Sequence, residues 1–171
     1  MGESVDLENT GHALLAFNEI DKAIQNYNHA IQIADEINFP QTQSYARWGL
    51  ALAHLYAAQH KDLPGLGDLN HLNAARAAAE AACKFDVPQN NHNVAALLGI
   101  IALAQAAQNP KGLEDPSGLD DPSGFFRAAI AHADALLAQT PELYAALDAK
   151  GIALCGLAII NPKGLPDPSG F

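Results

Sequence analysis

The sequence predicts an all-α protein built from antiparallel helix hairpins, and three observations support this. Of the 171 residues, 49% are apolar, and many of these are alanine. Alanine has the highest helix propensity and a small side chain, so windows such as residues 73–83 and 128–138 favour closely packed helices. No stretch alternates with the period of two that is typical of a strand. Glycine and alanine also recur at matched positions, with turn-forming residues between the recurrences.

The first hairpin is the clearest unit, at residues 11–37 (GHALLAFNEIDKAIQNYNHAIQIADEI). One helix opens around Gly11, residues 18–21 form a turn, and a second helix follows. On one face this second helix carries three residues, Ala23, Tyr27 and Ala30. Pro40 is expected to end the unit, because proline cannot continue a helix.

The second unit repeats this plan with an insertion. Its first helix covers residues 44–58, and Gly49 there matches Gly11. Residues 60–72 contain proline and glycine and are expected to form a loop or a short extra turn. The second helix resumes at Asn73. The residues that take the places of Ala23, Tyr27 and Ala30 are Ala75, Ala79 and Ala82.

The third unit begins with a helix over residues 94–107, in which Gly99 is the matching glycine. Asparagines precede this helix and are suited to capping it: Asn90, Asn91 and Asn93. An insertion at residues 109–125 follows, and a second helix starts at Phe126. We expect its inner face to carry Ala128, His132 and Ala135. The fourth unit is a single helix over residues 142–160 with Gly151.

The two insertions, at residues 109–125 and 161–171, share the sequences NPKGL and DPSG. Their aspartates are Asp115, Asp120, Asp121 and Asp167. Calcium ions need six to eight oxygen ligands, which such loops could supply, but the spacing of a calcium-binding loop is absent. Asp, Pro, Ser and Gly together are typical of a turn that leads into a helix. On one edge of the array, these loops would be within reach of a partner.

The glycine, alanine and tyrosine spacing resembles the tetratricopeptide repeat (TPR) family. This resemblance implies a right-handed α-solenoid of about three and a half repeats. The approximate repeats are residues 4–39, 43–88 and 93–141, with a half repeat at 142–171. Three segments also resemble the C-terminal TPR arrays of bacterial STAND-type signalling ATPases: YARWGLALAHLYAA, NNHNVAALLGIIAL and YAALDAKGIALCGLAI. That second resemblance implies a sensor or scaffold segment of a larger protein, and no phosphate-binding loop assigns ATPase activity to these residues.

In such arrays the first helices of the hairpins line a concave face. The candidate groove residues are Glu8, His12, Leu50, His54, Ile100, Leu103, Asp148 and Ile152. Leu50, Ile100 and Ile152 make this groove apolar, which suits an amphipathic helix. Family members that hold a peptide C-terminus use lysine, asparagine and arginine in these positions, whereas Glu8 and His12 stand here. Alternatively, the groove is filled by other parts of the same parent protein.

Charge and residue usage exclude several other functions. Nine basic residues against nineteen acidic ones give a net charge of −10, which disfavours nucleic acid and anionic membranes as partners. Without a signal peptide or a long apolar run, a cytoplasmic setting is expected. Cys83 and Cys155 lie in apolar runs, where free cysteine behaves as a small hydrophobe. The seven histidines show no ligand spacing, so no metal, cofactor or catalytic set is predicted.

The sequence therefore predicts a non-catalytic module that binds a protein or peptide through its apolar concave face. An alternative is a structural role, in which the molecules self-associate through the incomplete fourth unit. That helix has apolar residues on more than one side: Ile152, Leu154, Leu157 and Ile159. A small-molecule or metal-dependent enzyme is a third possibility. Because the last unit lacks a second helix, we expect either a fragment of a longer protein or a terminal helix that caps the array.

Overall fold

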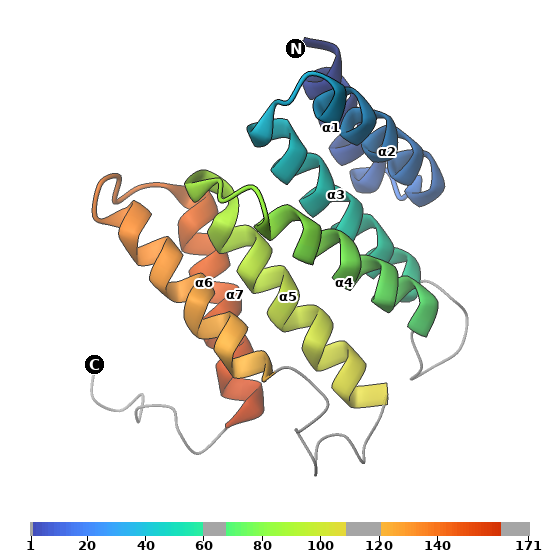
Figure 1. Ribbon diagram of the computed structural model, residues 1–171. Coiled ribbons are helices and arrows are strands. Elements are labelled where there is room, and N and C mark those ends of the chain that lie inside the picture. Colours follow the sequence, from blue (N-terminus) through green and yellow to red (C-terminus); the bar gives the residue numbers. More distant parts are fainter. Residues whose placement is uncertain (1, 60–67, 109–120, 162–171) are drawn as a thin grey trace.

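The computed structural model describes residues 2–59, 68–108 and 121–161. Within these ranges all regular structure is helical, as predicted, and no strand is present. The helices are α1 (Gly2–Ala16), α2 (Ile20–Glu36), α3 (Pro40–Gln59), α4 (Leu69–Cys83), α5 (Pro88–Gln108), α6 (Pro122–Leu137) and α7 (Tyr144–Ile160). They form a row with α1 and α2 at one end and α6 and α7 at the other (Figure 1).

Asparagine and aspartate end three helices in the left-handed backbone conformation. Asn18, Asn38 and Asp86 have φ values of 60°, 51° and 43°. At Asn38 the turn is closed by the Phe39 N–H, which donates to the carbonyl of Ala34 at 2.9 Å. Asparagine and aspartate adopt this conformation more readily than other residues with a side chain, and the bond satisfies a carbonyl at the helix end. The chain can therefore reverse direction within a few residues and bring consecutive helices together.

Proline begins three helices, and this changes the boundaries expected from the sequence. Pro40, Pro88 and Pro122 each occupy a first helical position, where a missing N–H leaves no bond unmade. Pro40 thus separates α2 from α3 and is also the first residue of α3. The sequence prediction missed this helix start. Because α5 begins at Pro88, Asn90 and His92 are buried within the helix. The prediction that Asn90, Asn91 and Asn93 precede and cap this helix is wrong, because all three lie within it.

The DPSG sequence at residues 121–124 forms the start of α6, with Asp121 at the position before its first residue. The carboxylate of Asp121 accepts hydrogen bonds from the backbone N–H of Ser123 at 2.9 Å and from its hydroxyl at 2.6 Å. These bonds lower the pKa of Asp121 from its ordinary value. The predicted contact between the Asp side chain and a nearby backbone N–H is therefore confirmed for this copy, whereas Pro122, Ser123 and Gly124 form the first turn of α6 and not a turn before it. The remaining aspartates of the two insertions, Asp115, Asp120 and Asp167, lie outside the described residues.

The helices form two layers. Helices α1, α3, α5 and α7 contact one another in succession, and α2, α4 and α6 each pack between two of them (Figure 1). In the described ranges, α2, α4 and α6 do not contact one another, nor does α1 contact α7. The row is open, so the odd-numbered helices present a continuous face that no other described helix covers.

An aromatic ring joins three helices at each end of the row. Tyr27 of α2 is fully buried, and a Cβ atom added to Gly11 of α1 would lie 2.7 Å from its ring. A Cβ atom on Gly49 of α3 would lie 2.3 Å from the same ring. No Cβ contact between non-bonded residues is normally this short, so both positions require glycine. The close approach inferred from Gly11 and Tyr27 is therefore present, and Gly49 shares it.

Phe126 of α6 has the same role at the other end. Its ring is fully buried, and Cβ atoms on Gly99 of α5 and Gly156 of α7 would lie 2.5 and 2.3 Å from it. Gly151 is the matching glycine predicted for α7, but nothing lies within 4 Å of a Cβ atom there. Gly156 is the glycine of α7 that receives the ring.

The predicted inner faces are correct for α4 and wrong for α6. Ala75, Ala79 and Ala82 are fully buried, as expected. On α6 the buried residues are Ser123, Phe126, Ala129 and Ala133, whereas His132 and Ala135 are exposed. An alanine-rich helix has small residues on every face, so alanine alone does not identify the buried one. Cys83 and Cys155 are also exposed, contrary to the expectation that they pack as small hydrophobes.

The packing of aromatic rings against glycine predicts opposite effects on stability for two glycine-to-alanine substitutions. Gly49→Ala forces a methyl group into the Tyr27 ring, which Gly11 confines from the other side, and should destabilise the protein by about 1–3 kcal/mol. Gly151→Ala has open space and gains helix propensity, so it should be neutral or stabilising by up to about 1 kcal/mol. Urea denaturation of both variants measures the difference. Equal stability of the two would contradict the proposed role of the Tyr27 slot.

Candidate functional site

Two adjoining hollows make an apolar groove on the face of the odd-numbered helices. The larger has a volume of about 710 Å³ and lies between α5, α6 and α7. The smaller has a volume of about 310 Å³ and extends to α3. Both are lined by Ile100, Asp148 and Ile152, so they form one continuous feature, called here the apolar groove.

Each helix contributes a row of side chains at helical spacing to the apolar groove. Trp48 and Leu52 come from α3, Ile100 and Leu103 from α5. From α7 the row is Asp148, Ile152, Cys155 and Ile159. Residues three or four apart share one face of a helix, which explains why each row faces the same way. On α7 these side chains are accessible, with Ile152 exposed by 45% and Ile159 by 72%.

Asp148 is the charged residue of the apolar groove. It lines both hollows, and the other lining side chains are uncharged at neutral pH. The nearby Lys150 pairs instead with Asp134 of α6, at 2.6 Å. The carboxylate of Asp148 therefore gives an otherwise apolar surface a single negative charge.

A cluster around His12 supports the α3 side of the groove. Nδ1 of His12 lies 2.8 Å from the Tyr27 hydroxyl, a hydrogen bond between α1 and α2. The His12 ring also packs at 5.5 Å, centroid to centroid, against Trp48, which lines the smaller hollow. Burial, followed by the negative charge of Glu8, raises the pKa of Tyr27. The tyrosine therefore remains protonated and can donate to His12.

The structure brings half of the predicted groove residues together. Ile100, Leu103, Asp148 and Ile152 line the apolar groove. The other predicted residues lie elsewhere. Glu8 lines a separate hollow with Val5 and Phe39, and His12 contacts Trp48 without lining the groove. Leu50 packs among core residues around Tyr27, and His54 pairs with His71 of α4.

Trp48, Leu52, Leu147 and Ile159 line the groove but were missed in the sequence. On α5 and α7 the groove residues follow the matching glycine directly, as Ile100 follows Gly99. On α3 the groove residues do not follow the matching glycine directly. Leu50, which follows Gly49, packs into the core instead. The signal that could have found the α3 residues is their own four-residue spacing, since Trp48 and Leu52 are both large and apolar.

His92 of α5 is a buried polar residue close to the groove. Its ring is fully buried, and neither ring nitrogen has a hydrogen-bond partner. Burial, followed by the charge of His132, lowers the pKa of His92. The backbone of Ala145, on α7, acts in the opposite direction but does not form a hydrogen bond of normal geometry with the ring. His92 is therefore held in its neutral form at a cost to stability.

Among the described residues, no group of three or more His, Cys, Asp or Glu side chains is placed to hold a metal ion. In the same part of the chain, every helix is either too short or too polar to cross a lipid bilayer.

Comparison of the chain with models of protein families, with curated proteins and with solved structures found no match. The arrangement of the side chains themselves is therefore the basis for a functional interpretation.

Burial of His92 predicts a pH dependence of stability. Because its pKa is lower in the folded than in the unfolded protein, the unfolded state binds more protons once the pH falls below about 6.5. Stability should therefore decrease as the pH falls from 7.5 to 5. His92→Leu removes both unpaired nitrogens and should raise stability by about 1–3 kcal/mol at neutral pH, with a weaker loss on acidification. Urea denaturation at several pH values measures both effects.

The matched control is His29→Gln, because His29 is exposed on α2. This variant should keep the pH dependence of the unsubstituted protein. If His92→Leu and His29→Gln lose stability equally on acidification, His92 does not contribute to the pH dependence.

Proposed function

We propose that this chain is a non-catalytic, TPR-like interaction module that binds a polypeptide in its apolar groove. The two-layer arrangement of consecutive helices supports an α-solenoid in which the odd-numbered helices form the inner layer. In line with the resemblance to STAND-type arrays, the module would act as a sensor or scaffold segment of a cytoplasmic bacterial signalling protein.

The observation that carries this proposal is an accessible apolar groove with one carboxylate. Apolar side chains from α3, α5 and α7 line it, and Asp148 lies where the two hollows meet. Such a surface is complementary to an amphipathic helix that has one basic residue among its apolar side chains. The net charge of −10 also favours a basic partner.

The dimensions suit a short helix. Neighbouring packed helices are about 8–10 Å apart, so a groove that crosses α3, α5 and α7 is roughly 16–20 Å long. A helix rises about 1.5 Å per residue, so roughly 11–13 residues would span it. A helical segment of this length has three or four residues on one face, enough to contact Ile100, Ile152 and Ile159.

Binding can be tested with a fluorescent amphipathic peptide of about 16 residues that has leucine at helical spacing and one central arginine. The double variant Ile152→Asp plus Ile159→Asp places two charges in the groove and should weaken binding by at least about 30-fold, as expected for central contacts. Fluorescence anisotropy gives the dissociation constants. Both residues are exposed, so the fold should persist, and circular dichroism checks this.

Leu154→Asp is the matched control on the same helix. Leu154 is exposed by 47%, but it lies outside the residues that line the groove. This variant should bind the peptide normally.

Asp148→Lys should weaken binding of the arginine peptide and strengthen binding of a peptide with glutamate in place of the arginine. Peptide binding that is equal in the double variant and in the unsubstituted protein would contradict the proposal.

A second candidate function, self-association, is favoured by a row of exposed side chains on α7 that borders the apolar groove. Tyr144, Leu147 and Leu154 form this row at helical spacing, called here the outer stripe, and all three are exposed. Gly151 lies within the row, has no neighbour within 4 Å of a Cβ position, and lines the edge of the groove together with Leu147. A small residue inside an apolar stripe allows another helix to approach closely, so two copies could pair through α7.

Self-association through the outer stripe predicts a concentration-dependent dimer. Leu154→Glu should weaken it at least about tenfold, because the charge would be buried between two helices. Ile152→Asp, on the groove side of α7, should leave the dimer intact. Sedimentation velocity over a range of concentrations measures both variants. A monomer at all concentrations in the unsubstituted protein would exclude this function.

A further inference from the structure

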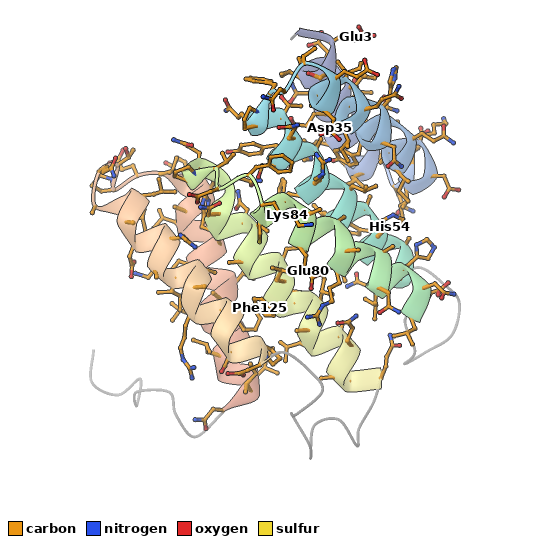
Figure 2. The ribbon with its side chains drawn as sticks, in the orientation of Figure 1. Glu3, Asp35, His54, Glu80, Lys84 and Phe125 are labelled. Atoms are coloured by element: carbon orange, nitrogen blue, oxygen red, sulfur yellow. The ribbon has the colours of Figure 1, made fainter. Side chains whose placement is uncertain are left out.

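Two histidines from neighbouring helices meet outside the apolar groove. His54 lies in the second half of α3, where Figure 2 labels it, and His71 lies in the first turn of α4. Their Nδ1 atoms are 3.0 Å apart. The ring centroids are separated by 5.3 Å, and the ring planes are inclined by 36°. Both side chains are only half buried, so small solutes can reach them.

Within the described part of the chain, the two rings are partners of each other and not of a carboxylate. In the ranges that the structure describes, neither ring forms an ion pair with a carboxylate. With one ring protonated on Nδ1 and the other not, the two nitrogens share one hydrogen bond.

The distance between the nitrogens also fits a shared metal ion. Imidazole nitrogens bind zinc at about 2.0–2.1 Å. Two such ligands on one ion, at angles between a right angle and the tetrahedral value, are roughly 2.9–3.4 Å apart. The separation of 3.0 Å lies within this range. Binding would require the Nδ1 proton to be replaced by one on Nε2, so that both rings present an Nδ1 lone pair, and the ring planes to turn toward the ion, while both helices keep their positions.

We propose that His54 and His71 form a two-imidazole site for a divalent transition metal ion such as Ni²⁺, Cu²⁺ or Zn²⁺, bound through both Nδ1 atoms. Imidazole is a preferred ligand of these ions, and affinity rises from Ni²⁺ to Cu²⁺ at a given site. Water completes the coordination. The bound ion links α3 to α4 and stabilises the folded state, because the two nitrogens are not held together in the unfolded chain.

Calorimetric titration of the full chain with NiCl₂ at pH 7.5 tests this site. A Cys83→Ser, Cys155→Ser background removes the two exposed thiols, which would otherwise bind the metal. We expect one equivalent of Ni²⁺ to bind with a dissociation constant in the micromolar range and to raise the melting temperature. His54→Gln and His71→Gln should each weaken binding at least tenfold. The double variant should bind no more weakly than either single variant, because each already removes the chelate.

His29→Gln is the matched control, since His29 is an exposed histidine on α2. It should bind Ni²⁺ as the background does. The two ligands are on different helices, so either single variant that keeps its helical circular dichroism spectrum is sufficient for the test. Absence of saturable binding up to millimolar Ni²⁺, or equal affinity in the His54, His71 and His29 variants, would overturn the proposal.

Discussion

The spacing between the two helix layers depends on an aromatic ring packed between glycines. Tyr27 touches the positions of Gly11 and Gly49, and its ring has no exposed surface. One side chain thus sets the distance from α2 to both α1 and α3. Since any Cβ atom would collide with the ring, the two odd-numbered helices lie as close to α2 as backbone atoms allow. This geometry orders the layers from which the groove residues project.

The middle of the row uses a different solution. Ala79 occupies the place of the tyrosine on α4, and Ala75 and Ala82 flank it, all without exposed surface. Larger residues supply the volume around this alanine face, mainly Leu55 of α3, Leu72 of α4 and Ile101 of α5. The core is therefore filled by one large aromatic ring near each end and by several smaller aliphatic side chains in the centre. In both cases a small residue on one helix faces a larger one on a neighbour, which maintains close packing.

The sequence allowed the helical class and the pairing of the first two helices to be predicted because Tyr27 stands out among small residues, although α1 begins at Gly2 and not around Gly11. The register of α6 could not be found in this way. Alanine occurs on all sides of that helix, and the ring that marks its buried face, Phe126, lies at its start next to a second phenylalanine. The starts of α3, α5 and α6 were also displaced, because a proline that excludes one helix is well suited to the first position of the next. Helix α4 begins at Leu69, within the expected loop at residues 60–72, because Asp68 caps it.

The groove residues of α5 and α7 could be predicted because the two helices repeat one pattern of residues. The same repeat explains the exposed surface of α7. Asn93, Ala96 and Ile100 line the smaller hollow opposite Ala145, Asp148 and Ile152. Each residue has its counterpart at the same interval along the chain, so the two helices present matching faces.

In that register Gly151 corresponds to Gly99, the position against which the Phe126 ring packs. Helix α7 receives the ring at Gly156 instead and leaves Gly151 open. It therefore has one glycine engaged with the preceding helix and another with no described atom within 4 Å of its Cβ position. Asp148 gives the groove its charge, whereas the outer stripe, which shares Leu147 and Gly151 with the edge of the groove, is uncharged. An amphipathic basic segment is complementary to the groove and a second apolar helix to the outer stripe, so a substitution outside the shared residues, at Ile152 or at Leu154, can separate the two interactions.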